Sequence, residues 1–215
     1  VRAADFRRFY DSTVVLARIP TILLAGGNKF SAGIEICHFG AHSLKDATLI
    51  YDIRDEQGNV YHKGKIRMPE IDNHSSNQSV GRVVMEKSFP DKAAKYFFNV
   101  SIQGTSVSNQ WVFWVFPRNV EARQKDVVVV HEMDENTIRL LKDGGKVLWL
   151  ADRSKLKGKL PLCFASIYWT AFGLNEGESM CNSIVCNHAH TLFDGFPNEM
   201  HSNWKWWDVL RYANP

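Results

Sequence analysis

The sequence has 215 residues, of which 45% are hydrophobic and 23% are charged, and its formal net charge is +3 at pH 7. This length and composition can bury one large core or two small ones, which excludes a disordered polypeptide. Basic residues are scattered among acidic ones and no apolar run approaches the roughly 20 residues that cross a bilayer, so we expect neither a nucleic-acid partner nor membrane insertion.

Residues 1–24 open with aromatic and charged residues and continue into the apolar run Val14 to Ala17. Residue 1 is Val rather than Met, and no charged and apolar leader follows it. We therefore interpret residues 1–24 as a linker from a preceding domain that is missing from this sequence.

From about residue 28 to residue 117, hydrophobic side chains recur with a period of two. They alternate along 30–37 and again along 47–54, and Asp55 to Asn59 supplies a hairpin turn in which Gly58 provides a positive φ. Six or seven short strands at this spacing predict a β-sandwich over residues 25–118. Further strands are expected at 60–66, 80–87, 95–103 and 110–116, with a polar loop at 72–79.

The pattern changes after the polar segment 117–125. Val127 to Val130 is typical of a strand buried on both faces, and Asp134 can cap a helix that presents Ile138, Leu140 and Leu141 inward. Glycines then end the helix before a second strand at 146–151. Strand, helix and strand over this distance predict a parallel sheet, and hence a small α/β domain over residues 119–215.

Three of the seven tryptophans lie at 204, 206 and 207. Ser202 or Asn203 can cap a short helix that carries them, with Trp206, Trp207 and Leu210 on one side. A C-terminal Trp-rich helix of this kind either docks its indoles into a core or presents a flat surface that stacks on sugars, and burial habits favour the core. The candidate carbohydrate-binding residues are Trp204, Trp206 and Trp169.

A metal site is a weaker candidate. Two thiols and two imidazoles fall within ten residues, but this spacing fits no standard zinc pattern, and the alternative is two free thiols with two surface histidines. The residues concerned are Cys181, Cys186, His188 and His190.

No motif indicates catalysis or a cofactor. Asn175-Glu176 is similar to the Asn-Glu pair that carries the general acid in family-2 glycosidases, but a (β/α)8 barrel needs about 250 residues and this dipeptide reads as a loop. Cys163 lacks the glycines of a nucleophile elbow, and the sequence has no glycine-rich phosphate loop. We therefore expect no catalytic residue and no cofactor.

Two blocks of sequence resemble a known family. The C-terminal block contains Asn187 to His190, Phe196-Pro197 and His201 to Asp208, and it resembles the end of multidomain family-2-like glycoside hydrolases of the β-galactosidase type from Bacteroidetes, although both prolines of the usual C-D-P-K-H-P are missing. The second block resembles the end of the immunoglobulin-like module in the same enzymes. It contains Gly104-Thr105, Asn109, Trp111 and Trp114 to Pro117.

The resemblance implies an immunoglobulin-like β-sandwich followed by a flavodoxin-like or glutamine-amidotransferase-like α/β domain. It implies a non-catalytic accessory region of a glycoside hydrolase, packed on the catalytic barrel domain of the same polypeptide and exported to the periplasm or secreted. The alternative is a carbohydrate-binding module that holds an oligosaccharide through exposed tryptophans. A third possibility, a small enzyme of amidotransferase-like fold, requires a reactive thiol among Cys163, Cys181 and Cys186.

Overall fold

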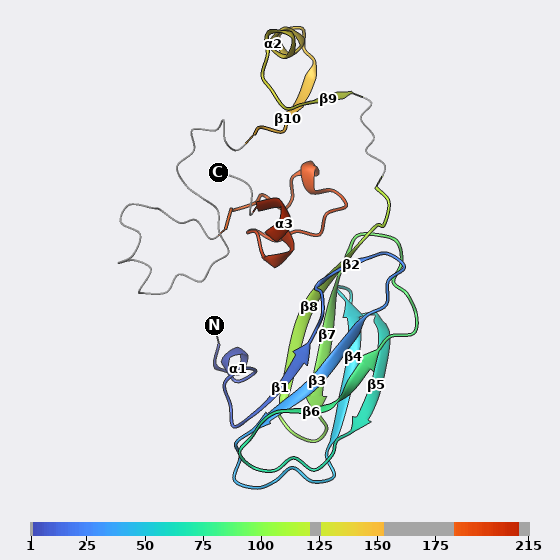
Figure 1. Ribbon diagram of the computed structural model, residues 1–215, viewed down its shortest axis with the longest axis vertical. Helices are drawn as coiled ribbons and strands as arrows, with labels where there is room; N and C mark the ends of the chain where they lie inside the picture. The colour runs from blue at the N-terminus through green and yellow to red at the C-terminus, as the bar shows by residue number, and fades with distance from the viewer. Residues whose placement is uncertain (1, 121–125, 153–182, 211–215) are drawn as a thin grey trace, which may run out of the picture. The chain divides into compact units, whose positions relative to one another are not determined.

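The computed structural model describes residues 2–120, 126–152 and 183–210 (Figure 1). The chain divides into two compact units. The first comprises Val1–Arg118 and Asp194–Pro197, and the second comprises Asn119–Phe193 and Asn198–Pro215. In the described ranges, no helix is both long and apolar enough to cross a membrane.

The first unit is a sandwich of two β-sheets, preceded by the short helix α1 (Ala3–Phe6). The smaller sheet has the strand order β1-β3-β6, with β1 (Thr13–Arg18), β3 (Ser31–His38) and β6 (Ser75–Val84). The larger sheet has the order β2-β8-β7-β4-β5, with β2 (Leu23–Ala25), β8 (Ser108–Phe116), β7 (Ala94–Ile102), β4 (Thr48–Asp55) and β5 (Val60–Arg67). Figure 1 shows the two sheets lying one over the other. The β-rich architecture predicted from the period-two pattern is confirmed.

The core lies between the two sheets. Burial alternates along β3, where Ala32, Ile34 and Ile36 are fully buried and the residues between them are partly exposed. The ring of Phe30 lies 4.6 Å from that of Phe113 and 5.0 Å from that of Phe98, centroid to centroid. Each fully buried side chain of this size contributes about 1.5–3 kcal/mol, so this aromatic group is a main stabilising element of the sandwich.

The predicted hairpin between β4 and β5 is present. Gly58 has a φ of 84°, a region that glycine adopts without steric strain. The Asp55 carboxylate accepts hydrogen bonds from the backbone N–H groups of Gln57 (3.0 Å) and Asn59 (2.9 Å) and from the Asn59 side chain. These hydrogen bonds hold the pKa of Asp55 below its ordinary value. The bond from the Asn59 side chain has the largest effect.

Two segments differ from the sequence-based expectation. Residues 13–24, interpreted as part of the linker, contribute β1 to one sheet and most of β2 to the other. Residues 75–79, predicted as loop, form the first half of β6 and pair with β3. A backbone ladder needs no apolar side chains at an edge strand, so the polar composition of this segment did not reveal its pairing.

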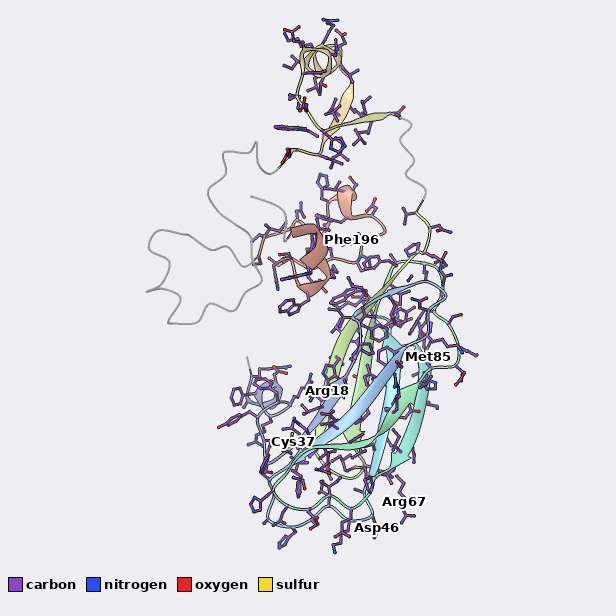
Figure 2. The ribbon with its side chains drawn as sticks, viewed as in Figure 1. Arg18, Cys37, Asp46, Arg67, Met85 and Phe196 are labelled. Atoms are coloured by element: carbon purple, nitrogen blue, oxygen red, sulfur yellow. The ribbon has the colours of Figure 1, made fainter. Side chains whose placement is uncertain are left out.

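The first unit carries exposed ion pairs on its surface. Arg67 and Asp46 form an exposed pair at 2.9 Å, near one end of the sandwich (Figure 2).

Phe196, from the short C-terminal segment that belongs to this unit, stacks on Phe116 with the ring centroids 5.3 Å apart. The first unit is therefore not built from a continuous stretch of chain.

The second unit contains a β-α-β element. Strands β9 (Val127–Val130) and β10 (Lys146–Trp149) are parallel, and α2 (Glu135–Lys142) connects them. Asp134 caps α2 as predicted, since its carboxylate accepts hydrogen bonds from the backbone N–H (2.8 Å) and hydroxyl (2.7 Å) of Thr137.

The predicted burial of this element is wrong for several side chains. The exposed fractions of Ile138 and Leu141 are 42% and 43%, and those of Val127 and Val128 are 38% and 48%. The described part of the sheet has only two strands, and a two-stranded sheet with one helix covers little apolar surface.

The C-terminal part of the second unit is irregular. Its short helices are η3 (Thr191–Phe193), η4 (Trp204–Trp206) and α3 (Trp207–Leu210). An antiparallel bridge joins Val185 to His201. Asn203 caps η4 by accepting a hydrogen bond from the backbone N–H of Lys205 at 3.1 Å, as the sequence predicted.

Candidate functional site

A groove with a volume of about 560 Å³ crosses the larger sheet of the first unit. Its walls come from β4, β5, β7, β8 and the segment that follows α1, and we call it the sheet groove. Pockets that hold small ligands have volumes of roughly 300–1,000 Å³, so this groove has the size of a binding site.

Strand register builds the polar floor of the sheet groove. Asp52 of β4 lies opposite Asn99 of β7 and Lys63 of β5, and Asn99 lies opposite Gln110 of β8. Since directly opposed residues project to the same face of a sheet, these four side chains form one row across four strands.

Hydrogen bonds connect three members of this row. Gln110 Nε2 donates to Asn99 Oδ1 at 2.7 Å, and Asn99 Nδ2 donates to Asp52 Oδ1 at 2.7 Å. Arg54 completes the chain by donating to both oxygens of Asp52, at 2.9 and 2.8 Å. The row is therefore fixed in position before any ligand arrives.

The charge of Asp52 is held in place by these contacts. Burial alone raises the pKa of the Asp52 carboxyl, but the hydrogen bonds from Arg54 and Asn99, together with the charge of Arg54, lower this pKa below its ordinary value. At neutral pH the Asp52 carboxylate is therefore ionised and paired with the Arg54 guanidinium. It is the single acidic residue among the described residues that line the groove.

Three cationic side chains border the sheet groove: Lys63 and Lys65 on β5, and Arg8 beyond α1. Both lysines are exposed, and within the described ranges none of the three makes an ion pair. Asn109 of β8 fixes the segment that carries Arg8, because its Nδ2 donates to the backbone oxygens of Arg8 (3.1 Å) and Val15 (3.0 Å). With Asp52 neutralised by Arg54, the groove carries an excess of positive charge.

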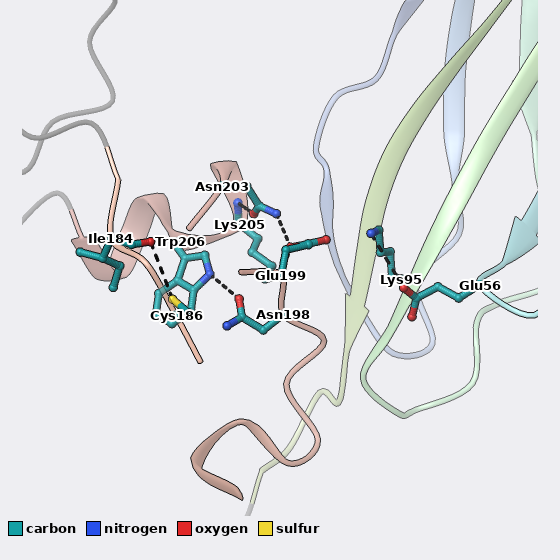
Figure 3. A network of polar contacts seen from close by, with 9 residues as sticks. All are labelled: Glu56, Lys95, Ile184, Cys186, Asn198, Glu199, Asn203, Lys205 and Trp206. Carbon is teal, nitrogen blue, oxygen red and sulfur yellow. Dashed lines mark hydrogen bonds and ion pairs between the residues drawn. The ribbon is translucent and has the colours of Figure 1, made fainter. Parts of the chain in front are cut away.

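The tryptophans predicted as sugar-binding residues fall into different environments. Trp204 is 59% exposed, and its ring lies 6.1 Å from that of Trp207, which is 39% exposed. Trp206 is 9% exposed; its Nε1 donates to Asn198 Oδ1 at 3.0 Å (Figure 3), and its ring meets Phe193 edge-on. Trp206 and Trp207 thus do not share one buried side, and Trp169 lies outside the described residues.

A buried ion pair lies beside Trp206. Lys205 Nζ is 3.0 Å from Glu199 Oε2, and Asn203 Nδ2 donates to the same oxygen at 2.6 Å (Figure 3). The Lys205 side chain has no exposed surface. These contacts tie two residues at the start of η4, Asn203 and Lys205, to Glu199.

The candidate metal ligands are only partly described. Cys186 is a buried free thiol, whereas His188 and His190 are exposed. His190 Nδ1 accepts a hydrogen bond from the backbone N–H of Leu192 at 3.0 Å. Cys181 lies outside the described residues, and within the described ones no three His, Cys, Asp or Glu side chains are placed to hold a metal ion.

The sequence analysis missed the sheet groove. Its residues belong to four strands and to the segment after α1, and they extend along the sequence from Arg8 to Gln110, so no local motif contains them. The available signal was the set of polar side chains that alternate with the core residues along each strand, namely Asp52, Lys63, Asn99 and Gln110.

Two family models match the sequence. Residues 28–117 match a domain of unknown function (DUF8488), and residues 128–215 match another domain of unknown function (DUF8487). No curated protein matches the sequence.

Several of the solved structures similar to this chain are carbohydrate-active enzymes. A Paenibacillus sp. cycloisomaltooligosaccharide glucanotransferase is 12% identical over 56% of this chain and 16% of its own, with a TM-score of 0.38. A β-glucuronidase from glycoside hydrolase family 2 is 17% identical over 49% of this chain and 11% of its own, with a TM-score of 0.34. A putative β-galactosidase from Bacteroides fragilis is 12% identical over 63% of this chain and 24% of its own, with a TM-score of 0.33. The chain thus spans less than a quarter of the length of these enzymes, and at TM-scores below 0.5 the matches assign no function to it.

Proposed function

We propose that this chain is a non-catalytic accessory region of a glycoside hydrolase and acts in carbohydrate degradation. The observation that carries the proposal is the sheet groove, a preformed surface of hydrogen-bonding side chains with a single carboxylate. Glycoside hydrolysis generally needs two carboxyl groups, one on each side of the scissile bond. Asp52, the one acid in the described lining, is bound to Arg54 and Asn99 and so is unsuited to proton transfer.

The sequence resemblance to family-2-like enzymes supports the same proposal. In this proposal the parent enzyme is of the β-galactosidase type, its catalytic barrel belongs to the same polypeptide, and the protein is periplasmic or secreted. The sandwich would be the immunoglobulin-like module of that enzyme. Residues 119–215 would form the small α/β domain with a parallel sheet, for which the β9–α2–β10 element is the support.

Hydrolysis assays test the accessory role. The purified chain is incubated with aryl β-galactosides, β-glucosides and β-glucuronides, and release of the aryl group is followed over hours. We expect no release above the rate without protein. Release that is lost in Asp52→Asn, but kept in the matched surface variant Asp72→Asn, would overturn the proposal by making the sheet groove an active site.

A second candidate function is that of a carbohydrate-binding module which uses the exposed Trp204 and its neighbour Trp207. The exposure of these two side chains favours this function, because aromatic rings stack on the apolar faces of sugars. Titration with neutral oligosaccharides, followed by tryptophan fluorescence, tests it. Saturable changes that vanish in Trp204→Ala would establish this function, and a flat response to the whole panel would exclude it.

A further inference from the structure

We propose that the sheet groove binds an acidic oligosaccharide, with uronic-acid carboxylates beside its cations and sugar hydroxyls over its polar row. The choice of a sugar rests on the proposed role in carbohydrate degradation. The position of the site and the preference for negative charge come from the geometry of the groove.

The polar row retains both unused hydrogen-bond donors and unused hydrogen-bond acceptors. Asn99 and Gln110 each use one of two N–H donors within the row, and the Gln110 side-chain oxygen accepts no hydrogen bond within the described ranges. Asp52 accepts three of about four possible bonds. Sugar hydroxyls both donate and accept, so a row that offers donors and acceptors side by side is complementary to them.

The cations lie at the two sides of this row. Lys63 and Lys65 stand on β5, and Arg8 stands beside β8, three strands away in the sheet order. Neighbouring strands are about 4.8 Å apart, which places the two sides roughly 14 Å from each other. A ligand that contacts both sides must therefore extend across β5, β4, β7 and β8, as a trisaccharide would.

The spacing of the two lysines favours separated charges over one compact anion. Residues two apart on a strand are about 7 Å from each other, so Lys63 and Lys65 reach different points along a ligand. Carboxylates repeated along a sugar chain match this arrangement.

Calorimetric titration of the 215-residue chain with trigalacturonate tests the proposal, and its methyl ester provides the matched neutral ligand. The two trisaccharides share every ring hydroxyl and differ only at their carboxyl groups, which are charged in the acid and methyl esters in the other ligand. We expect the acid to bind and the ester to bind at least about tenfold more weakly, since hydrogen bonds to charged groups are the stronger ones. Binding of the acid should weaken between about 50 mM and about 500 mM salt as ions screen the exposed cations.

Variants locate the binding site. Lys63→Gln with Lys65→Gln should weaken binding of the acid about tenfold or more, and Gln110→Ala should weaken binding of both ligands. Lys87→Gln makes the same kind of substitution at an exposed position outside the groove, where it removes one positive charge, and it should change nothing. All of these side chains are exposed, so near-ultraviolet circular dichroism should be unchanged.

Three outcomes would overturn the proposal: equal affinity for acid and ester, no binding of either, or an unaltered affinity in the double lysine variant. Tighter binding of a sulfated trisaccharide than of trigalacturonate would overturn the assignment to uronic acids. These results are separate from those of the hydrolysis assay. Turnover would refute the accessory role whether or not the acid binds.

Discussion

The ammonium group of Lys205 is completely buried, 3.0 Å from Oε2 of Glu199, whose side chain is 30% exposed. Losing the carboxylate weakens the electrostatic stabilisation of this buried ammonium group, because the protein interior solvates a charge poorly. Glu199→Gln should therefore destabilise the C-terminal part of the second unit by about 1–3 kcal/mol, measured by urea unfolding followed through tryptophan fluorescence.

The matched control is Glu86→Gln, which removes an exposed partner of Lys29 at 3.4 Å. Exposed pairs contribute about 0–1 kcal/mol, so this variant should unfold nearly as the original chain does. Equal effects of the two variants would contradict the importance assigned to the buried pair.

Phe113 should be among the most sensitive positions of the sandwich. It is fully buried and stacks on Phe30 and Tyr96, so Phe113→Ala should cost about 3–5 kcal/mol of unfolding free energy. The Val112 side chain lies on the opposite face of β8 and is only partly buried. Val112→Ala should cost about 1 kcal/mol, and a loss as large as that of Phe113→Ala would place the core on the wrong side of the sheet.

The hairpin after β4 should make stability depend on pH. Because the pKa of Asp55 is lowered in the folded chain, chiefly by the Asn59 side chain, its contribution is complete above the unfolded value of about 3.9. That contribution is lost as the pH falls through the lower folded value. The midpoint of thermal unfolding should thus differ between the original chain and Asp55→Asn at about pH 6, and the difference should shrink at about pH 2.5. A difference that does not depend on pH would contradict this assignment.

The α2 cap can be tested separately. Asp134→Ala removes the acceptor for Thr137 and should lower the local stability of α2, with faster amide hydrogen exchange in the first turn. Asp134→Asn keeps an acceptor oxygen and should lose less. If exchange in α2 is the same in both variants and in the original chain, the cap has no stabilising role.

Quenching by acrylamide distinguishes the two C-terminal indoles. Trp204→Phe should remove an accessible component of the emission, because Trp204 is 59% exposed. Trp206→Phe should instead remove a shielded component, since Trp206 is 9% exposed and hydrogen-bonded to Asn198. If acrylamide quenches the emission removed by Trp204→Phe and the emission removed by Trp206→Phe equally, the two indoles do not differ in exposure as described.

The sandwich could be predicted because its strands carry a strong local signal. Alternating apolar residues along β3 and β4 specify which face is buried, and Gly58 marks the turn between β4 and β5. Strands β1 and β2 gave a weaker signal, since β2 has only three residues and its pairing with β8 depends on chain far away in sequence.

The sheet groove could not be predicted, because its polar row exists only once strand register is fixed. Asp52, Asn99 and Gln110 are each an ordinary polar residue on the outer side of a strand. The tryptophans were visible in the sequence, but their exposure was not. Trp206 is buried through contacts with Asn198 and Phe193 that no helical period specifies.

The pairing of β2 with β8 has a mechanical consequence. These strands are parallel, and backbone bonds join Leu23–Ala25 to Trp114–Phe116, extended by Gly26 N–H to the Phe116 oxygen at 2.7 Å. If tension pulls the chain before β1 and the chain after β8 in opposite directions, it loads these bonds in shear. They must then break together rather than one after another, so β2 acts as a clamp that resists extension of the sandwich.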